Sequence, residues 1–455
     1  MKESMVQEYT SKHILRDLRG PRRGRKGQNG QGCPRDLTVQ WKPSKPLRRN
    51  DQFPWLPWSH RFQTPLWRSP YARLECEIRA FDAYFSPSPV EKRAADVARN
   101  DIEQAIRSAD PDLRIDLIGS RATGLAGPIS DIDLNISSPA DRSANHHGDP
   151  NKAAGILTSL YRTMRRQYKQ KLKEEPATPA VLPLYHVHRA AVPIITGLHR
   201  PTGLPFQIQC TSDSYESMEY TKSFLKEHPT LLCLFRVIKQ MLAMRGLCSG
   251  QSGGLTAYPL LNMIVAALKF SEGEIPPTQA GAQLMYFLDM YIDIDFESHG
   301  ISIIPLQYFP KRTVAHRSIP SRSMKHLEGP PVHRNDRFLE AVAARKLLSI
   351  PRPGYPYMMT LQDPANPYND LGKGTHQIRD MQETFIVLRE SLLRALERYG
   401  KDTEHANFNH AGYPPLLGAC LGGDYSIFQH ERDELRAVGP GNDRDILEES
   451  SIFLT

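Results

Sequence analysis

Two aspartates separated by one residue, Asp131 and Asp133, are the side chains whose type and spacing most clearly suit chemistry. They alternate with the aliphatic residues Ile132 and Leu134. In a β-strand, residues two apart project from the same face, so both carboxylates would point one way and both aliphatic side chains the other. Two like charges side by side are costly unless a cation lies between them. Oxygen ligands suit Mg²⁺, which proteins often hold with a few carboxylates plus substrate phosphates.

A second feature lies twelve residues upstream, where a short apolar run over residues 115–118 ends in Gly119-Ser120. Backbone N–H groups at such a turn can hold a phosphate group. A phosphate cradle and a metal-binding carboxylate pair on adjacent strands indicate nucleotidyl transfer. The alternative for the Asp-x-Asp pattern alone is an edge strand with a solvated face.

The surrounding pattern predicts the elements that must position these residues. A Ser-x-x-Glu capping box at Ser88 begins a helix that leads into the strand at 115–118, and the strand at 131–136 follows. A helix is expected over 151–173 and further strands over 187–195 and 204–210, with 197–203 connecting them. Short strands interspersed with helices indicate an α/β palm built on a mixed sheet. Beyond residue 214 the spacing predicts helices over 215–225, 230–244, 255–270, 280–293, 337–348, 377–399 and 424–436, with loops over 305–336 and 350–360.

The helix over 151–173 carries basic residues and no acid on its outer faces. Its cations are Lys152, Arg162, Arg165, Arg166, Lys169, Lys171 and Lys173. Such a face is either simply solvated or a track for a phosphate backbone.

Charge is concentrated at the N-terminus. The 455 residues carry a net charge of +8, and residues 1–50 hold 13 Lys and Arg against 4 Asp and Glu, so the remainder carries 45 basic and 46 acidic residues. Residues 1–60 read as a disordered tail that binds RNA, directs the chain to the nucleus or mitochondrion, or has no specific role. Six cysteines without a Cys-x-x-Cys pair fit a reducing intracellular compartment, and no run of about 18 apolar residues predicts a membrane span.

Three segments in order resemble one enzyme family. Gly-Ser followed by Asp-x-Asp resembles the polymerase-beta-like nucleotidyltransferase superfamily. Two further segments follow in order: Gly253-Gly254-Leu255, and Leu361 to Lys373, which contains Asp363-Pro364. With them, residues 85–400 resemble the non-canonical poly(A) and poly(U) polymerases. The resemblance implies an α+β fold, with a mixed-sheet nucleotidyltransferase palm and its N-terminal arm over residues 61–214 and a helical PAP-associated domain over 215–400. That helical domain would carry a loop insertion at 305–360, and residues 401–455 would be a C-terminal extension.

The resemblance also implies residue roles. Gly119 and Ser120 would hold the triphosphate, while Asp131 and Asp133 would bind Mg²⁺ or Mn²⁺. Lys239 would contact the triphosphate, Tyr258 would stack on the base, and Asn369 and Asp370 would lie near the base edge. Each of these last four has a plainer alternative: an exposed helix cation for Lys239, ordinary packing for Tyr258, and a polar loop that caps a helix for Asn369 and Asp370. Uridylyl-transferring relatives have His at the position of Asn369, so Asn favours ATP.

One departure from the family concerns catalysis directly. The family places a third carboxylate, the expected base, on the strand matching 204–210, where an ungapped alignment puts Gln209 and a two-residue shift puts Gln207. An amide cannot accept the proton of a hydroxyl group. Asp213 is four residues beyond Gln209, although a turn or helix cap is the alternative there. Ala257 also stands where relatives commonly have Ser before the Tyr.

Two hypotheses follow. The first is an RNA 3′-terminal nucleotidyltransferase that adds AMP from ATP with Mg²⁺, whose partners are RNA and an NTP. The second is a catalytically impaired relative that binds RNA or a partner protein. A nucleotidyltransferase for small molecules is a third reading, which the basic tail and the helix over 151–173 disfavour.

Overall fold

The computed structural model describes residues 38–40, 47, 52–56, 69–138, 150–174, 179–187, 193–211, 214–312, 334–405 and 413–439. The chain forms two compact units. Unit 1 comprises residues 1–39, 86–215 and 425–455, and unit 2 comprises 40–85 and 216–424. Among the described residues, 69–85 group with the helical unit and 425–439 group with the palm, so the division differs there from the expected boundaries.

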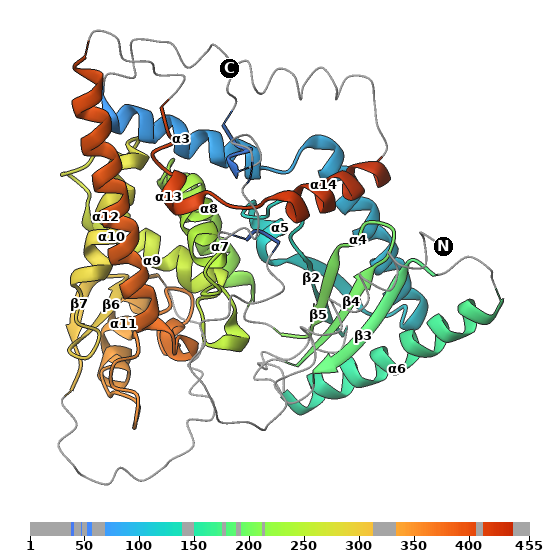
Figure 1. Ribbon diagram of the computed structural model, residues 1–455. Coiled ribbons are helices and arrows are strands. Elements are labelled where there is room, and N and C mark those ends of the chain that lie inside the picture. The colour runs from blue at the N-terminus through green and yellow to red at the C-terminus, as the bar shows by residue number, and fades with distance from the viewer. Residues whose placement is uncertain are drawn as a thin grey trace, which may run out of the picture. The chain divides into compact units, whose positions relative to one another are not determined.

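Unit 1 is built on a five-stranded sheet in the order β1-β2-β5-β4-β3. Figure 1 labels the strands β2, β5, β4 and β3 of this sheet. Its strands are β1 (Arg114–Ile118), β2 (Ile132–Ser137), β3 (Val181–Val187), β4 (Ile194–His199) and β5 (Pro205–Gln209). β2 and β5 pair in parallel and every other neighbouring pair is antiparallel. The sheet is therefore mixed, as the sequence predicts.

The two faces of this sheet differ in chemistry. Ile132, Leu134 and Ile136 of β2 and Phe206 and Ile208 of β5 are fully buried on one face. There they share a core with apolar side chains of α4 (Pro89–Ala109) and α6 (Pro150–Glu174). The alternate residues Asp133, Asn135 and Ser137 of β2 and Gln207 and Gln209 of β5 are polar and project from the other face. The helices thus bury the apolar face, and the polar face is left for the candidate site.

The start of α4 ties the sequence-distant helix α14 (Ser426–Val438) into unit 1. Ser88 and Glu91 form the predicted capping box, with the Ser88 N–H donating to Glu91 Oε2 at 2.7 Å. Glu91 is fully buried and also accepts two hydrogen bonds from Arg432, at 2.7 and 3.0 Å. Arg436 lies 3.0 Å from the same carboxylate. This ion cluster explains why α14 groups with unit 1.

Replacing Arg432 with Ala is expected to lower the free energy of unfolding by about 3 kcal/mol, because the substitution leaves a buried carboxylate with one cation fewer. Urea denaturation measures the change. The control is Lys222→Ala, which removes an exposed ion pair with Glu219 and should cost less than about 1 kcal/mol. Equal effects of the two substitutions would contradict the importance of the buried cluster.

Unit 2 is mainly helical. Its longer helices are α3 (Pro70–Phe85), α8 (Leu231–Ala243), α9 (Ala257–Phe270), α10 (Ala280–Asp293), α11 (Arg334–Leu348) and α12 (Ile378–Thr403), and the chain enters the unit along α7 (Ser214–Glu227). Short turns η4 (Gly250–Ser252), η5 (Leu371–Gly374) and α13 (Gly418–Leu421) complete it. The helices expected beyond residue 214 are confirmed, with shifted ends. Phe53 and Trp55 lie within residues 1–60, which were expected to form a disordered tail, but both are buried, and Trp55 packs edge-to-face on Phe53 and on Phe81 of α3. For these residues the expectation is wrong.

Three expectations about strands are corrected. A single strand was predicted over 187–195, but β3 ends at Val187 and β4 begins at Ile194, with 188–192 outside the described residues. Gly197 lies inside β4 instead of beginning a connection. The predicted loop over 305–336 includes β7 (Leu306–Pro310), which pairs with β6 (His299–Ile303). Among the described residues, no helix combines the length and apolarity needed to cross a bilayer.

Candidate active site

The aspartate pair lies where β2 begins, on the polar face of the unit 1 sheet. Asp131 immediately precedes the strand, and Asp133 is its second residue. Both aspartates are half-buried, whereas Ile132 and Leu134 between and after them are fully buried. The period-two pattern predicted from the sequence is therefore present, and the two carboxylates project from the same face.

Gly119 packs directly against Asp133. It has a positive φ of 69°, and a Cβ atom at this position would lie 2.2 Å from Asp133 Oδ2. The short helix α5 (Gly119–Thr123) begins here, and the first N–H groups of a helix have no partner within it. The predicted phosphate cradle and the carboxylate pair are therefore neighbours in space, although twelve residues separate them in sequence.

Replacing Gly119 with Ala is expected to weaken divalent-metal binding by about tenfold or more, the scale of effect seen when groups that orient a ligand are disturbed. The added methyl group would displace the Asp133 carboxylate. Gly124→Ala is the control, because Gly124 also has a positive φ, of 88°, but nothing lies within 4 Å of its Cβ position. Titration with Mn²⁺ followed by electron paramagnetic resonance measures both variants. Equal weakening would mean that backbone strain, and not contact with Asp133, causes the loss.

Arg121 of α5 holds the loop that leads into β2. Its Nε donates to the carbonyl oxygens of Ser130 and Asp131, each at 3.1 Å, and its guanidinium also donates to the Pro128 carbonyl at 3.1 Å. Burial lowers the pKa of Arg121, while the nearby charge of Asp131 raises it. Arg121 therefore fixes the backbone of Asp131 relative to the Gly119 turn.

The third strand places a glutamine beside the pair, and it is Gln207. In the β2–β5 register Gln207 is opposite Asp133, and Gln209 is opposite Asn135, one step further from the pair. The side-chain amide of Gln207 donates to Asp131 Oδ2 at 2.7 Å. The ungapped assignment of Gln209 to the third-carboxylate position is thus replaced by Gln207, the two-residue alternative. Both positions are amides, so the structure puts no carboxylate at either.

Further polar groups lie on the same face of the sheet. Asp116 of β1 pairs with Asn135 across the sheet, and its carboxylate accepts from Tyr215 Oη at 2.7 Å and contacts Arg114 at 2.9 Å. Thr196 of β4 lies opposite Gln207, and its hydroxyl is buried without a hydrogen-bond partner among the described residues. Asp213 lies outside the described residues. The carboxylate oxygens of Asp131 and Asp133 are of the kind that Mg²⁺ accepts, while the next group along this face, Gln207, is a hydrogen-bond donor.

In unit 2, four of the residues from the family segments form one network. Tyr258 Oη donates to Asp363 Oδ1 at 3.0 Å, and Asn369 Nδ2 donates to Asp363 Oδ2 at 2.8 Å. Lys373 Nζ in turn donates to Asn369 Oδ1 at 2.8 Å. Burial raises the pKa of Asp363, whereas the hydrogen bonds from Asn369 and Tyr258 lower it. The buried Asp363 thus orients both Tyr258 and Asn369, two of the residues predicted to contact the base.

Asp370, Lys239 and Ser120, which were also predicted to contact the nucleotide, make local contacts in the structure. Asp370 Oδ1 accepts from the backbone N–H groups of Leu361 (3.0 Å) and Gly372 (2.8 Å) and so caps η5, which matches the plainer alternative. Lys239 is half-buried on α8, with Nζ 5.6 Å from the centre of the Phe235 ring. Ser120 lies in α5 beside Gly119, with its carbonyl accepting from the Ala126 N–H at 3.1 Å.

Sequence reasoning missed Arg121 and Asp363. Arg121 directly follows the Gly-Ser pair, but its partners are backbone carbonyl oxygens. Every residue has such an oxygen, so the sequence does not identify these contacts. Asp363 stands in the Asp-Pro segment that carried the resemblance, and a buried acid within reach of a Tyr and an Asn is visible only once the three segments are folded together.

A family model described as "Nucleotidyltransferase domain" matches residues 99–201. The match contains the Gly119 turn and the Asp pair, and it ends before β5, which carries Gln207. The matched region lies entirely in unit 1.

Curated relatives are similar over most of this chain. The poly(A) RNA polymerase cid14 of Schizosaccharomyces pombe is 23% identical over 370 residues, which are 79% of this chain and 46% of that protein. The poly(A) RNA polymerase protein 2 of Saccharomyces cerevisiae is 23% identical over 321 residues, 69% of this chain and 46% of that protein. The chain thus spans about half the length of these relatives. A protein named an inactive non-canonical poly(A) RNA polymerase, Trf4-2 of Drosophila melanogaster, is 24% identical over 69% of this chain and 66% of its own length.

Among solved structures, the polymerase core of TRAMP, an RNA surveillance complex, has a TM-score of 0.60 at 20% sequence identity. The likeness covers 81% of this chain and 99% of that one. It confirms the predicted α+β fold, with a mixed sheet and a helical part.

Proposed function

We propose that this chain, which resembles the non-canonical poly(A) RNA polymerases in sequence and fold, is an RNA 3′-terminal nucleotidyltransferase that adds AMP from ATP. The observation that carries the proposal is the carboxylate pair of Asp131 and Asp133 at the start of β2, with the Gly119 turn packed against Asp133. This places two oxygen ligands next to backbone N–H groups at a helix start, which suits a metal-bound triphosphate.

The residues divide the work between them. Asp131 and Asp133 would hold Mg²⁺ or Mn²⁺, and such ions stabilise the negative charge that develops on the transferred phosphate and the leaving pyrophosphate. The backbone of Gly119 and Ser120 would hold the triphosphate, and Arg121 keeps Asp131 in place. Catalysis on this plan rests on position and charge more than on covalent chemistry.

The nucleotide base would be held by Tyr258 and Asn369. Tyr258 offers a flat ring for stacking, and its hydroxyl is fixed by Asp363. Asn369 carries both a donor and an acceptor, and Asp363 and Lys373 fix its orientation. A fixed amide can select a base by hydrogen bonding, and the resemblance associates Asn at this position with ATP.

Gln207 is the observation that favours a second candidate, a catalytically impaired relative that binds RNA or a partner. Its amide is a hydrogen-bond donor to Asp131 and cannot take the proton of the primer 3′-hydroxyl. In an active enzyme, that proton would pass to one of the two aspartates or to water. Extension of an RNA primer by the purified chain with Mg²⁺ or Mn²⁺ and each NTP separately decides between the candidates. ATP-dependent extension supports the first, and binding without extension supports the second.

The RNA itself would run along α6. Arg162, Arg166, Lys169 and Lys173 are exposed on one face of this helix at spacings of four, three and four residues, while Leu157, Leu160 and Met164 are buried on the opposite face. A line of cations on a rigid helix suits a phosphate backbone. The alternative is a solvated face.

Changing these four α6 residues to Gln is expected to weaken RNA binding and to reduce the slope of log affinity against log salt by about 3, since each single-strand phosphate contact contributes about 0.7. Fluorescence anisotropy with a short oligo(A) at several salt concentrations measures the slope. The matched control changes three exposed cations of α12, Arg394, Arg398 and Lys401, to Gln. An unchanged slope in the α6 variant would indicate a solvated face.

A further inference from the structure

The connection between α7 and α8 contains a buried histidine with a ring nitrogen that has no hydrogen-bond partner among the described residues. His228 follows the last residue of α7, and only 7% of its surface is exposed. Its Nε2 atom is buried and has no hydrogen-bond partner among the described residues. Buried polar atoms in folded proteins nearly always have a partner, so an unpartnered ring nitrogen in this position requires an explanation.

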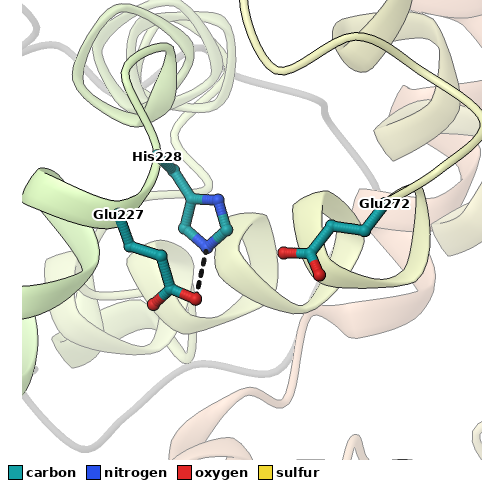
Figure 2. Close-up of side chains that lie close together, drawn as sticks. All are labelled: Glu227, His228 and Glu272. Atoms are coloured by element: carbon teal, nitrogen blue, oxygen red, sulfur yellow. Dashed lines mark ion pairs between the residues drawn. The ribbon is translucent and has the colours of Figure 1, made fainter.

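Two carboxylates face this nitrogen from either side, as Figure 2 shows. Glu227 ends α7, and its Oε1 lies 3.8 Å from His228 Nε2. Glu272 comes from the turn that follows α9. One ligand atom from each of the three residues lies within 4.8 Å of the other two. All three residues belong to unit 2.

We propose that Glu227, His228 and Glu272 bind a divalent transition-metal ion of the zinc class. Such ions accept an imidazole nitrogen together with carboxylate oxygens, whereas Mg²⁺ takes oxygen ligands alone. Three protein ligands with a fourth position open to solvent form a common coordination pattern for zinc. This site would be separate from the Asp131 and Asp133 pair, and it does not depend on the proposed function.

The geometry needs only a small closure. Bonds of about 2.0–2.1 Å in a tetrahedral arrangement put ligand atoms roughly 3.3 Å apart. The buried His228 ring is fixed, and both glutamates are exposed, so their side chains can move the short distance inward. A rigid ligand with two adjustable ones is suited to an ion that is acquired after folding.

Lys269 is the competitor for this site. It forms an ion pair with Glu227, and its side chain is 18% exposed. Its ammonium group therefore neutralises one of the two carboxylates when no metal is bound. Metal binding would displace the Lys269 ammonium group from Glu227. Replacing Lys269 with an uncharged residue would therefore increase the affinity for the metal.

A bound ion would join two connections of unit 2. His228 and Glu227 lie at the α7–α8 connection, and Glu272 lies between α9 and α10. An ion that binds the folded state alone stabilises that state by mass action. Zinc would therefore raise the melting temperature of the chain.

Cobalt(II) tests the site because it reports its coordination through visible absorption. The experiment uses the full chain carrying Asp131→Asn and Asp133→Asn, so that the candidate catalytic pair cannot contribute and the failure of either proposal can be recognised separately. After treatment with a chelator, this protein should bind one Co²⁺, which Zn²⁺ then displaces. Adding His228→Gln should weaken binding at least tenfold, and adding Lys269→Met should strengthen it.

His405→Gln, a change at an exposed histidine, is the control and should leave Co²⁺ binding unchanged. Zn²⁺ should raise the melting temperature of the parent and of the His405 variant, and not that of the His228 variant. Absence of Co²⁺ binding in the parent, or equal binding by the His228 variant, would overturn the proposal.

Discussion

Replacing Asp133 with Asn is expected to lower the rate of RNA primer extension about a thousandfold, because loss of a metal ligand removes several kcal/mol of charge stabilisation in the transition state. Asn keeps the size and shape of the side chain, so the packing against Gly119 is preserved. The loss then reports charge and metal binding rather than disruption of the turn. Steady-state primer extension with ATP and Mg²⁺ measures the rate.

Asp116→Asn is the matched control for this substitution. Asp116 lies on the same face of the sheet, on the neighbouring strand β1. Its carboxylate interacts with Tyr215 and Arg114 and is not proposed as a metal ligand. Extension by this variant should stay close to that of the wild type. Wild-type extension by the Asp133 variant would refute the metal role of the pair.

The central motif could be predicted because its pattern is local. The alternation of Asp131, Ile132, Asp133 and Leu134 needs only the period of a β-strand to assign one face to chemistry and the other to the core, and the structure has this arrangement. The capping box at Ser88 is equally local and is present. Helices of unit 2 such as α10 were predictable for the same reason, since their apolar spacing repeats over several turns.

The position opposite Asp133 could not be settled in this way. Gln207 and Gln209 lie on the same face of β5, so a period-two argument cannot distinguish them. The choice depends on the register between two strands that are about 70 residues apart in the chain. That register is set by how Phe206 and Ile208 pack into the core of unit 1, which is a tertiary effect.

The domain boundaries depended on long-range contacts as well. The buried cluster of Glu91 with Arg432 joins residues 341 positions apart, and no pattern within either segment identifies its partner. The edge strand β3 was missed because it contains Pro183 and a register irregularity, both of which interrupt the regular alternation of a strand. Edge strands tolerate these features, since one side of their backbone pairs with no other strand.

Replacing Gln207 with Asp is the second prediction, and it addresses the missing carboxylate directly. The substitution changes a donor to Asp131 into a third oxygen ligand and a proton acceptor beside the pair. We expect the rate of primer extension to rise by about a hundredfold or more, because a positioned general base contributes about 10²–10⁴ in rate. Such a gain would show that the amide at position 207 limits the rate of the wild-type chain.

Gln209→Asp is the matched control, because it makes the same change on the same strand and face. Gln209 is opposite Asn135 and not Asp133, so its carboxylate would stand one register step away from the metal pair. Extension by this variant should remain at the wild-type level. A gain at 209 and none at 207 would contradict the register-based assignment.

Stability provides a readout that does not depend on turnover. In a chelator, Gln207→Asp places a third like charge beside Asp131 and removes a hydrogen bond from it, so its melting temperature should fall below that of the Gln209→Asp variant. Mg²⁺ should restore the stability of the Gln207 variant selectively, because a cation between the carboxylates offsets their repulsion.

If wild-type protein extends primers rapidly and Gln207→Asp adds nothing, the two aspartates are sufficient and the impaired candidate is refuted. If Mg²⁺ restores stability without any extension, the site binds metal and the chain acts through binding alone.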